Sequence, residues 1–338
     1  MKIIVSRTDK AGDLILTTPV FRELRKNLPE ASIIAHVKKY TAPILKLGSD
    51  VGDVILDDDF PTVLALSKKF KEIQADKIII VHPSRKVLMA AFLARIPQRI
   101  GRASNVWQFL LTSRKVQKRS RNEKHEFEYN LDLLTDLFSL IKYDGPKFSI
   151  PKNLENKGKE ILKAAGFTDT FPIVLHPGHG GSAYNLSPHQ YSALCRMLMT
   201  RNLAVAVSLG PGEENLRKLF PEQEKNKIGY IVNVPDLAVL AGVFKNCLAF
   251  VGGSTGPMHI AAALNKPVLA FYPPVPAMTP KRWGPICSEK LVVIPDIKKC
   301  NLKCINCSNH PCMNRIDLAS SVDWLERKLK NESSAADQ

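Results

Sequence analysis

The chain has 338 residues, of which 45% are hydrophobic and 24% charged, proportions that suit a globular protein with real cores. At roughly 150 residues per domain this length predicts two domains. No apolar run approaches the ~20 residues that cross a bilayer, and the N-terminus lacks a secretory signal, so we expect a cytosolic protein. The formal charge of +16 indicates an anionic partner such as nucleic acid, a lipid surface or an anionic substrate.

Short apolar runs alternate with helical patterns in the first half of the chain. Continuous β-branched runs, as in 78–81, are typical of parallel strands covered on both faces. We predict strands at 2–6, 32–37, 54–56 and 77–82, helices near 14–27, 41–47, 63–70 and 87–94, and a longer amphipathic helix at 126–141. The turn-rich stretch 142–147 begins a linker.

The same alternation restarts at residue 172. We predict strands at 172–176, 203–209, 248–251, 267–271 and 291–294, helices at 190–200, 213–220 and 237–245, and a disordered tail from 331 to 338. Repeated βα units on both sides of a linker predict an α/β protein with two doubly wound, Rossmann-like parallel-sheet domains. We assign them to residues 1–155 and 156–316, followed by a C-terminal helix and tail at 317–338.

In such sheets ligands bind beyond the carboxyl ends of the strands, and three turns there carry candidate residues. The first holds Gly12-Asp13 before a helical pattern that starts at Leu14. Asp13 could be the N-cap of that helix, or it could face a cleft as a general base. A helix start lowers the pKa of a carboxylate, and desolvation in a closed cleft offsets that effect.

Two further turns follow strands of the second half. The glycine-rich turn in His176–Pro188 offers backbone donors near Ser182 that suit an anion, although such turns often serve geometry alone. In the turn at 209–214, Glu213 or Glu214 could accept hydrogen bonds from ribose hydroxyls, or both could merely complement a helix dipole.

The stretch Val251–Leu264 reads as a strand end, a small-residue turn and a helix that opens with Pro257. A helix start presents unpaired N–H groups and partial positive charge, so the backbone at Ser254, Thr255 and Gly256 suits a phosphate. Thr255 and His259 add side-chain donors, unless His259 is simply a buried, satisfied histidine.

Together these motifs resemble glycosyltransferase family 9, the ADP-heptose:lipopolysaccharide heptosyltransferases, over nearly the whole chain. The carriers are Gly12-Asp13-Leu14 with Thr17-Thr18-Pro19, His176-Pro-Gly178, Gly210-Pro-Gly-Glu213, Ser254–Leu264 and Asn265–Ala270. The resemblance implies a GT-B fold, an N-terminal acceptor domain and a C-terminal domain for a nucleotide sugar. It implies inversion at the anomeric carbon with Asp13 as base, diphosphate contacts at Thr255 and Gly256, and a nucleoside contact at Glu213 or Glu214.

Two positions depart from the family pattern, which often has Lys where Asn185 stands and Asp where Ser254 stands. These changes alter the charge near the diphosphate, so the expected donor is ADP-heptose or a related nucleotide sugar. The helix start at Ser254–Pro257 meets the charge of the departing diphosphate, and we expect no cofactor to be required.

The cationic segment 95–124, with Arg102, Arg119 and Arg121, is expected to face an anionic lipopolysaccharide core acceptor, together with Thr17 of the family motif. We expect a monomer in peripheral contact with the cytoplasmic face of the inner membrane, and no nucleic-acid partner because no recognised module is present. The alternatives are a GT-B-type nucleotide-sugar epimerase and a non-enzymatic cationic surface-binding protein.

Four of the seven cysteines cluster at Cys300, Cys304, Cys307 and Cys312. In a cytosolic chain such clustering favours a metal over disulfides, and four thiolates can close a tetrahedral structural zinc site. Reduced free thiols and an iron–sulfur cluster remain alternatives.

Overall fold

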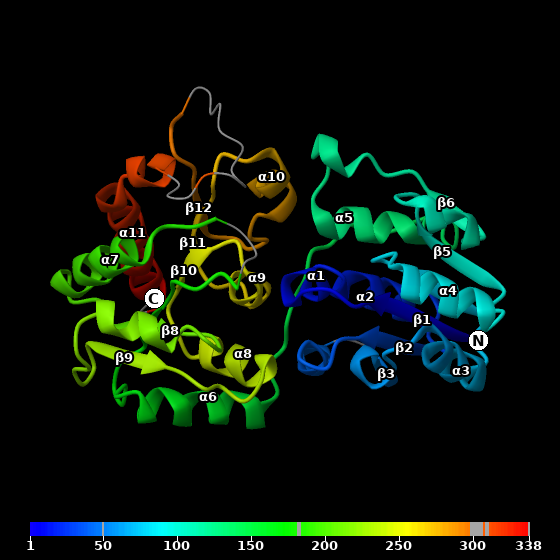
Figure 1. Cartoon of the computed structure of the whole chain (residues 1–338). Helices are drawn as coiled ribbons and strands as arrows, with labels where there is room; N and C mark the ends of the chain where they lie inside the picture. Colours follow the sequence, from blue (N-terminus) through cyan, green and yellow to red (C-terminus); the bar gives the residue numbers. More distant parts are fainter. Residues whose placement is uncertain (49–50, 181–183, 298–306, 308–310, 337–338) are drawn as a thin grey trace. The chain divides into compact units, whose positions relative to one another are not determined.

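The computed structural model describes residues 1–48, 51–180, 184–297, 307 and 311–336. The chain divides into two compact units, unit 1 at Met1–Pro146 and unit 2 at Lys147–Gln338, coloured from blue to green and from green to red (Figure 1). The division falls at the end of the turn-rich stretch 142–147, whereas the expected boundary at 155/156 falls inside α6 (Lys152–Ala164).

Unit 1 contains a six-stranded, fully parallel sheet in the order β3-β2-β1-β4-β5-β6. The strands in chain order are β1 (Lys2–Arg7), β2 (Ser32–Val37), β3 (Asp53–Leu56), β4 (Lys77–Ile80), β5 (Gln98–Arg102) and β6 (Ser113–Lys115). This is the Rossmann order, in which the chain reverses its direction of growth between β1 and β4. Ligands bind at the carboxyl ends of the strands at such a switch point.

Helices cover both faces of the unit 1 sheet. The helices α3 (Val63–Ile73) and α4 (Arg85–Leu93) pack on one face with the 3-10 helix η3 (Val106–Leu110), around an apolar cluster that includes Ile4, Phe70 and Ile80. Contacts join α2 to α5 and to β2. The remaining helical elements are α1 (Ala11–Ile15), α2 (Thr18–Asn27), η1 (Ala42–Leu47), η2 (Asp57–Asp59), η4 (Arg119–Arg121), α5 (Glu126–Leu131) and η5 (Asp132–Leu134).

Unit 2 repeats the same strand order. Its parallel sheet runs β12-β11-β10-β7-β8-β9, so the switch point lies between β7 and β10. The strands are β7 (Ile173–His176), β8 (Val205–Ser208), β9 (Ile228–Ile231), β10 (Phe250–Gly253), β11 (Val268–Phe271) and β12 (Lys290–Val293).

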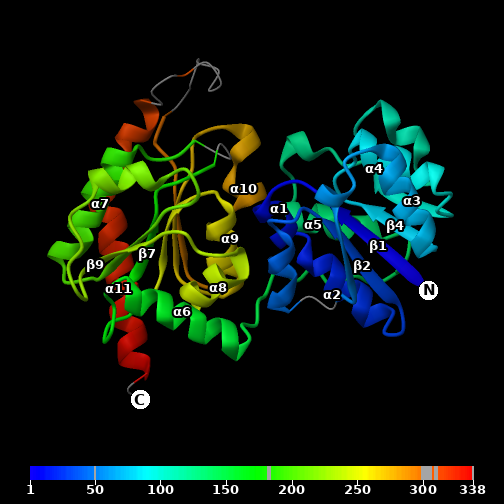
Figure 2. The same cartoon turned by 60° about the horizontal axis from the view of Figure 1, so that its bottom comes forward.

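The unit 2 sheet lies between two helical layers, with α7 and α11 on one side and α8 and α9 on the other (Figure 2). A Ser187–Gln190 capping box starts α7, and Asp236 caps α8. The helical elements besides α6 are α7 (Pro188–Thr200), η6 (Glu214–Leu219), α8 (Leu237–Lys245), α9 (Gly256–Ala263), η7 (Pro276–Met278), α10 (Pro280–Trp283), η9 (Pro311–Arg315) and α11 (Leu318–Ala336).

The predicted two-domain, parallel α/β architecture is confirmed, but several elements differ. The expected helix at 14–27 is broken into α1 and α2, and the expected helix at 126–141 ends at Leu131 before one 3-10 turn. The expected disorder from 331 is contradicted as far as Ala336, where α11 ends. Among the described strands and α-helices, five were not predicted: β5, β6, β9, α6 and α10.

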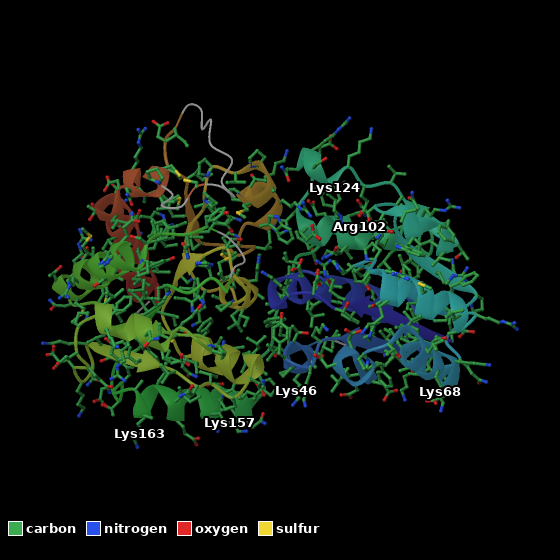
Figure 3. All side chains as sticks on the ribbon, viewed as in Figure 1. Lys46, Lys68, Arg102, Lys124, Lys157 and Lys163 are labelled. Carbon is green, nitrogen blue, oxygen red and sulfur yellow. The ribbon has the colours of Figure 1, made fainter. Side chains whose placement is uncertain are left out.

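The positive charge is shared by both units, although the cationic segment 95–124 lies in unit 1. Unit 1 holds 25 Lys and Arg against 17 Asp and Glu, and unit 2 holds 23 against 15, so each has a formal charge of +8. Figure 3 labels examples on both, Lys68 on α3 and Lys157 on α6 among them. Among the described residues, none of the helices is long and apolar enough to span a membrane.

A glycine-to-glycine contact joins α6 to α8. A Cβ built on Gly158 would lie 2.2 Å from the carbonyl carbon of Gly242, and one on Gly242 would lie 2.1 Å from the carbonyl oxygen of Leu154. The two backbones therefore touch where any side chain would force them apart. This contact holds the first helix after the unit boundary onto the unit 2 core.

We predict that Gly158→Ala destabilises unit 2 by about 1–3 kcal/mol, as overpacking of a tight contact does. The measurement is the midpoint of urea or thermal unfolding. Gly52→Ala is the matched control, since its nearest neighbour is an ordinary 3.6 Å contact. Equal midpoints for the Gly158 variant and the unmodified protein would contradict the tight packing.

Candidate active site

The candidate site of unit 1 is built around Arg7, the last residue of β1. Its side chain is 3% exposed, and its guanidinium pairs with three carboxylates: Nε lies 2.7 Å from Asp9 Oδ1, Nη1 lies 3.5 Å from Glu126 Oε1, and Nη2 donates to Asp13 Oδ1. A buried cation needs such partners because water cannot solvate it. Arg7 therefore gathers Asp9, Asp13 and Glu126 at the edge where ligands are expected.

Asp13 is the third residue of α1, and the N-cap position belongs to Lys10, so the N-cap interpretation of Asp13 is wrong. Burial raises the pKa of Asp13, and the negative charges of Asp9 and Glu126 raise it further. The Arg7 cation lowers it, but the pKa still lies above the ordinary aspartate value. Its side chain is still 18% exposed. This carboxylate is thus a better proton acceptor than an ordinary surface aspartate, and it remains accessible.

Asp9 links the Arg7 cluster to neighbouring strand ends. Burial raises the pKa of the Asp9 carboxyl, but Arg7 and His82 outweigh that effect and hold it below the ordinary value. His82 follows β4, and its Nδ1 lies 3.2 Å from Asp9 Oδ2. Tyr40 donates from its hydroxyl to the Asp9 carbonyl oxygen at 3.2 Å. Side chains after β1, β2 and β4 thus meet at one edge of the sheet.

A second, buried layer supports this edge. Arg119 Nη1 pairs with Glu126 Oε1, and Arg119 Nε donates to Gln117 Oε1 at 2.9 Å. Asn130 Nδ2 donates to the Leu16 carbonyl oxygen at 3.0 Å and to Thr17 Oγ1 at 3.3 Å. Asn130 on α5 therefore fixes the turn between α1 and α2, and Glu126 on the same helix joins Arg119 to Arg7.

The structure gives the predicted acceptor residues different environments. Thr17 is fully buried and donates to the Asp13 carbonyl oxygen at 2.8 Å, and Arg119 is buried in the supporting layer. Arg102 is half-buried at the end of β5, and Arg121 is exposed, 3.6 Å from Glu123. Thr17 and Arg119 thus position the candidate base rather than present groups at the surface.

The three consecutive acidic residues Asp57–Asp59 predict a solvated loop at the end of β3, but the structure buries the first of them. It is 3% exposed, and its carboxylate contacts His36 at 3.1 Å, Lys38 at 2.9 Å and Lys86 at 2.6 Å. Burial raises its pKa, but these three partners outweigh burial and hold the pKa well below the ordinary value. His36 also contacts Ser6 Oγ at 2.9 Å, so this network ties β1, β2 and η2 together.

In unit 2, the turns after β7 and β8 meet through Glu213. Its carboxylate accepts the Gly210 N–H at 2.8 Å, and a Cβ on Gly178 would lie 1.9 Å from its Oε2. His176 Nδ1 donates to the Ser208 carbonyl oxygen at 2.9 Å. Burial lowers the pKa of His176 despite the opposing charge of Glu213, so the imidazole is neutral. Glu214, by contrast, is exposed at the start of η6.

Asn185 is the most informative side chain of unit 2. It is 7% exposed, and its Oδ1 accepts from the Leu186 N–H at 2.9 Å and from the Tyr191 hydroxyl at 2.7 Å. These bonds fix the orientation of the amide. Its Nδ2 is buried and has no hydrogen-bond partner among the described residues. Gly253, at the end of β10, lies so close that a Cβ there would be 2.4 Å from Nδ2.

Directly after Gly253, the chain enters α9 through Ser254 and Thr255. Thr255 is the N-cap, but its side chain makes no capping bond, and Gly256 is the first helical residue. Ser254 hydrogen-bonds the Tyr272 side chain. His259 is buried on α9. The orphan amide of Asn185 and the N–H groups at the start of α9 therefore flank the same strand end, an arrangement that suits an anion.

Some predicted residues lie outside the described part of the chain. Ser182, Cys300 and Cys304 belong to this group, so the zinc site stays a prediction. Cys307 and Cys312 are part-exposed, and the described residues contain no group of three or more side chains that could hold a metal ion.

Sequence reasoning missed Arg7, Asp9, His82 and Glu126. Arg7 and Asp9 were detectable because they lie close to Asp13 in the sequence, whereas only the fold brings Glu126 there.

Comparison with known proteins identifies the class. The sequence profile of glycosyltransferase family 9 (heptosyltransferase) matches residues 63–312. A Haemophilus influenzae protein named as a glycosyltransferase is 31% identical over 84% of this chain and 86% of its own length. The lipooligosaccharide heptosyltransferase 2 of the same organism is 25% identical over 87% and 88%. The Escherichia coli ADP-heptose lipopolysaccharide heptosyltransferase II superposes with a TM-score of 0.82 at 19% identity, over 98% of this chain and 100% of its own.

The two Rossmann-like units and these matches define a glycosyltransferase with the GT-B fold. The chain belongs to glycosyltransferase family 9, the heptosyltransferase family.

The Asp57 network makes a prediction about stability and pH. Asp57→Asn leaves Lys38 and Lys86 without their shared anion, so we expect a loss of about 3 kcal/mol at pH 7. Because the folded-state pKa of Asp57 is depressed, its contribution is fully present above the ordinary aspartate pKa and declines as pH falls below it. The difference between variant and unmodified protein should therefore shrink from pH 6 to pH 3.

Urea unfolding midpoints across that pH range measure the effect. Asp59→Asn is the control, because Asp59 is exposed two residues away and should leave the midpoints unchanged at every pH. A constant difference for Asp57→Asn across the range would show that its ionisation does not stabilise the fold.

Proposed function

We propose that the protein is an inverting glycosyltransferase that moves a heptose, or a related sugar, from an ADP-sugar to the inner core of lipopolysaccharide. The observation that carries the proposal is the Asp13 carboxylate, which Arg7 holds at the switch-point edge of unit 1 with a raised pKa and partial exposure. Inverting transfer needs one base for the acceptor hydroxyl.

Asp13 is the base in this mechanism. The acceptor hydroxyl oxygen attacks the anomeric carbon and forms the new C–O bond, while the bond from that carbon to the diphosphate oxygen breaks. The hydroxyl proton passes to Asp13, and the bonding electrons leave with the nucleoside diphosphate. Arg7 is a positioning residue, since it holds the carboxylate and limits how far its pKa rises.

Unit 2 would bind the nucleotide sugar. The N–H groups at the start of α9 and the Nδ2 of Asn185 are the donors for the diphosphate, where negative charge develops as the bond breaks. The family resemblance leads one to expect a lysine at the Asn185 position, so this chain offers a neutral donor there. Glu213 is the candidate acceptor for ribose hydroxyls, because it is part-exposed where the turns after β7 and β8 meet; Glu214 is the less favoured alternative.

The acceptor and the cellular location are also proposals. Relatives bear names that refer to lipooligosaccharide and to ADP-heptose lipopolysaccharide transfer, which supports a phosphorylated core sugar on a lipid anchor as acceptor. Such an acceptor would place the reaction at the cytoplasmic face of the inner membrane.

A donor screen tests the proposal. Purified protein is incubated with ADP-heptose and with other nucleotide sugars, with and without a lipid A–Kdo acceptor, and nucleotide release is measured. We expect acceptor-dependent release of ADP. Asp13→Asn should lower the rate by roughly 10²–10⁴-fold, the usual contribution of a general base. Release that needs no acceptor, or no release from any nucleotide sugar, would overturn the proposal.

The pH profile gives a second prediction. Asp9 raises the pKa of Asp13 through its negative charge, so Asp9→Asn should lower that pKa and move the acid limb of kcat/KM to lower pH. Arg7→Gln should move it to higher pH, because the Arg7 cation opposes the rise. Asp59→Asn should leave the limb unchanged. If the acid limb moved in the same direction in both variants, Asp13 would be excluded as the titrating base.

Asn185 gives a third prediction, on the donor side. Asn185→Asp keeps the acceptor oxygen that Leu186 and Tyr191 use and replaces the orphan N–H₂ with a negative oxygen. We expect ADP to bind at least roughly tenfold more weakly, given about 1.5–3 kcal/mol for a hydrogen bond to a charged group. Isothermal titration measures the affinity.

Asn202→Asp adds the same charge at an exposed position beyond the C-terminal end of α7 and should bind ADP normally. Unchanged ADP affinity in Asn185→Asp, with the fold retained by circular dichroism, would exclude the orphan amide from the nucleotide site.

A further inference from the structure

Unit 1 carries a cluster of exposed apolar side chains on α4 and η3. Phe92 and Leu93 at the end of α4 are 48% and 46% exposed, and Val106 and Phe109 on η3 are 75% and 60% exposed. We call these four residues, with Arg85 and Trp107, the α4–η3 patch. Grouped apolar side chains of this size on a surface usually mark an interaction site.

Direct contacts make the patch one continuous surface. The ring centroids of Trp107 and Phe109 lie 6.1 Å apart, and the Arg85 guanidinium lies 5.0 Å from the Trp107 centroid. Arg99 bridges the two elements: its guanidinium lies 5.6 Å from the Phe92 centroid, and its Nε donates to the Leu110 carbonyl oxygen at 2.7 Å. The exposed side chains thus stand on a rigid base.

The sequence around the patch has only one sign of charge. The 46 residues from Lys77 to Asn122 contain eleven Lys and Arg and no Asp or Glu. Among these cations, Lys86, Lys115 and Arg119 pair with carboxylates from other segments, whereas Arg85 and Arg99 stack on the rings of Trp107 and Phe92 within the patch. Apolar side chains among guanidinium groups are the composition of segments that lie in an anionic membrane interface, where apolar burial and electrostatic attraction add.

We propose that the α4–η3 patch docks unit 1 onto a bilayer that contains anionic phospholipid. A second copy of this chain would bring like charges together, and a nucleic acid would make little use of Val106 and Leu93. The inference rests on the proposed function, because a lipid-anchored acceptor has to be reached at a membrane surface.

The η3 end of the patch is tied to the candidate catalytic edge. Asn105 caps η3, and its Nδ2 donates to the Pro83 carbonyl oxygen at 2.8 Å. Pro83 directly follows His82, which contacts Asp9. Docking through η3 would therefore place the ends of β1 and β4 near the lipid surface, within reach of a sugar on a lipid anchor.

Vesicle co-sedimentation of the full chain, without donor or acceptor, tests the proposal. We expect binding to vesicles of phosphatidylethanolamine and phosphatidylglycerol that weakens with salt, and little binding to pure phosphatidylcholine. The double variant Val106→Ser with Phe109→Ser should bind the anionic vesicles at least roughly tenfold more weakly. Both substituted side chains are exposed, so the variant should keep its fold, and the thermal midpoint checks this.

The matched control is Leu140→Ser with Phe171→Ser, which removes side chains that are 79% and 61% exposed elsewhere and should bind as the unmodified protein does. Unchanged vesicle binding in the patch variant, equal loss in the control, or tighter binding to a DNA duplex than to anionic vesicles would overturn docking through the patch. Because this assay needs no catalysis, its failure is distinguishable from failure of the donor screen.

Discussion

The arrangement of unit 1 depends on one buried cation. Arg7 ends the central strand β1 at 3% exposure, and a guanidinium in that position is tolerated only while carboxylates surround it. Burial alone lowers the pKa of Arg7, but Asp13, Asp9 and Glu126 outweigh burial and raise it, so the charge persists at every physiological pH. The need to pair this charge brings α5 to α1 and to the turn after β1, which lie more than 100 residues earlier in the chain.

The two units use the same topology with different electrostatics. At the β1/β4 switch point, ionised side chains surround Arg7, and one carboxylate keeps a raised pKa and partial exposure. At the β7/β10 switch point, the turns after the two strands present an amide, two hydroxyls and an imidazole whose pKa burial lowers, with Glu213 as a carboxylate beside them. A charged edge suits proton transfer, whereas neutral N–H donors suit a ligand that brings its own negative charge.

Local signals in the sequence located most of the strands and the turns that follow them. Buried β-branched runs predicted β1, β4 and β7, and a capped apolar segment predicted α8 with its observed bounds. They failed for β5 and β6, where Arg and Lys obscure the apolar alternation. They also predicted too long a helix at 126–141, because α5, which carries Glu126 and Asn130, ends at Leu131. Asp13 was found from its motif, but Arg7 as its partner depends on pairing across the fold. Asp57 looked solvated because its three cationic neighbours come from other elements.

The orphan amide of Asn185 also bears on the lifetime of the protein. A buried donor without a partner costs about 1–3 kcal/mol, and a ligand that accepts from it removes that cost only in the folded state. Folding and ligand concentration are then linked, with a gain of about 2.7 kcal/mol when ligand is present at a hundred times its Kd. Under the proposed function that ligand is a nucleotide, and resistance of unit 2 to proteolysis would then rise with the nucleotide concentration.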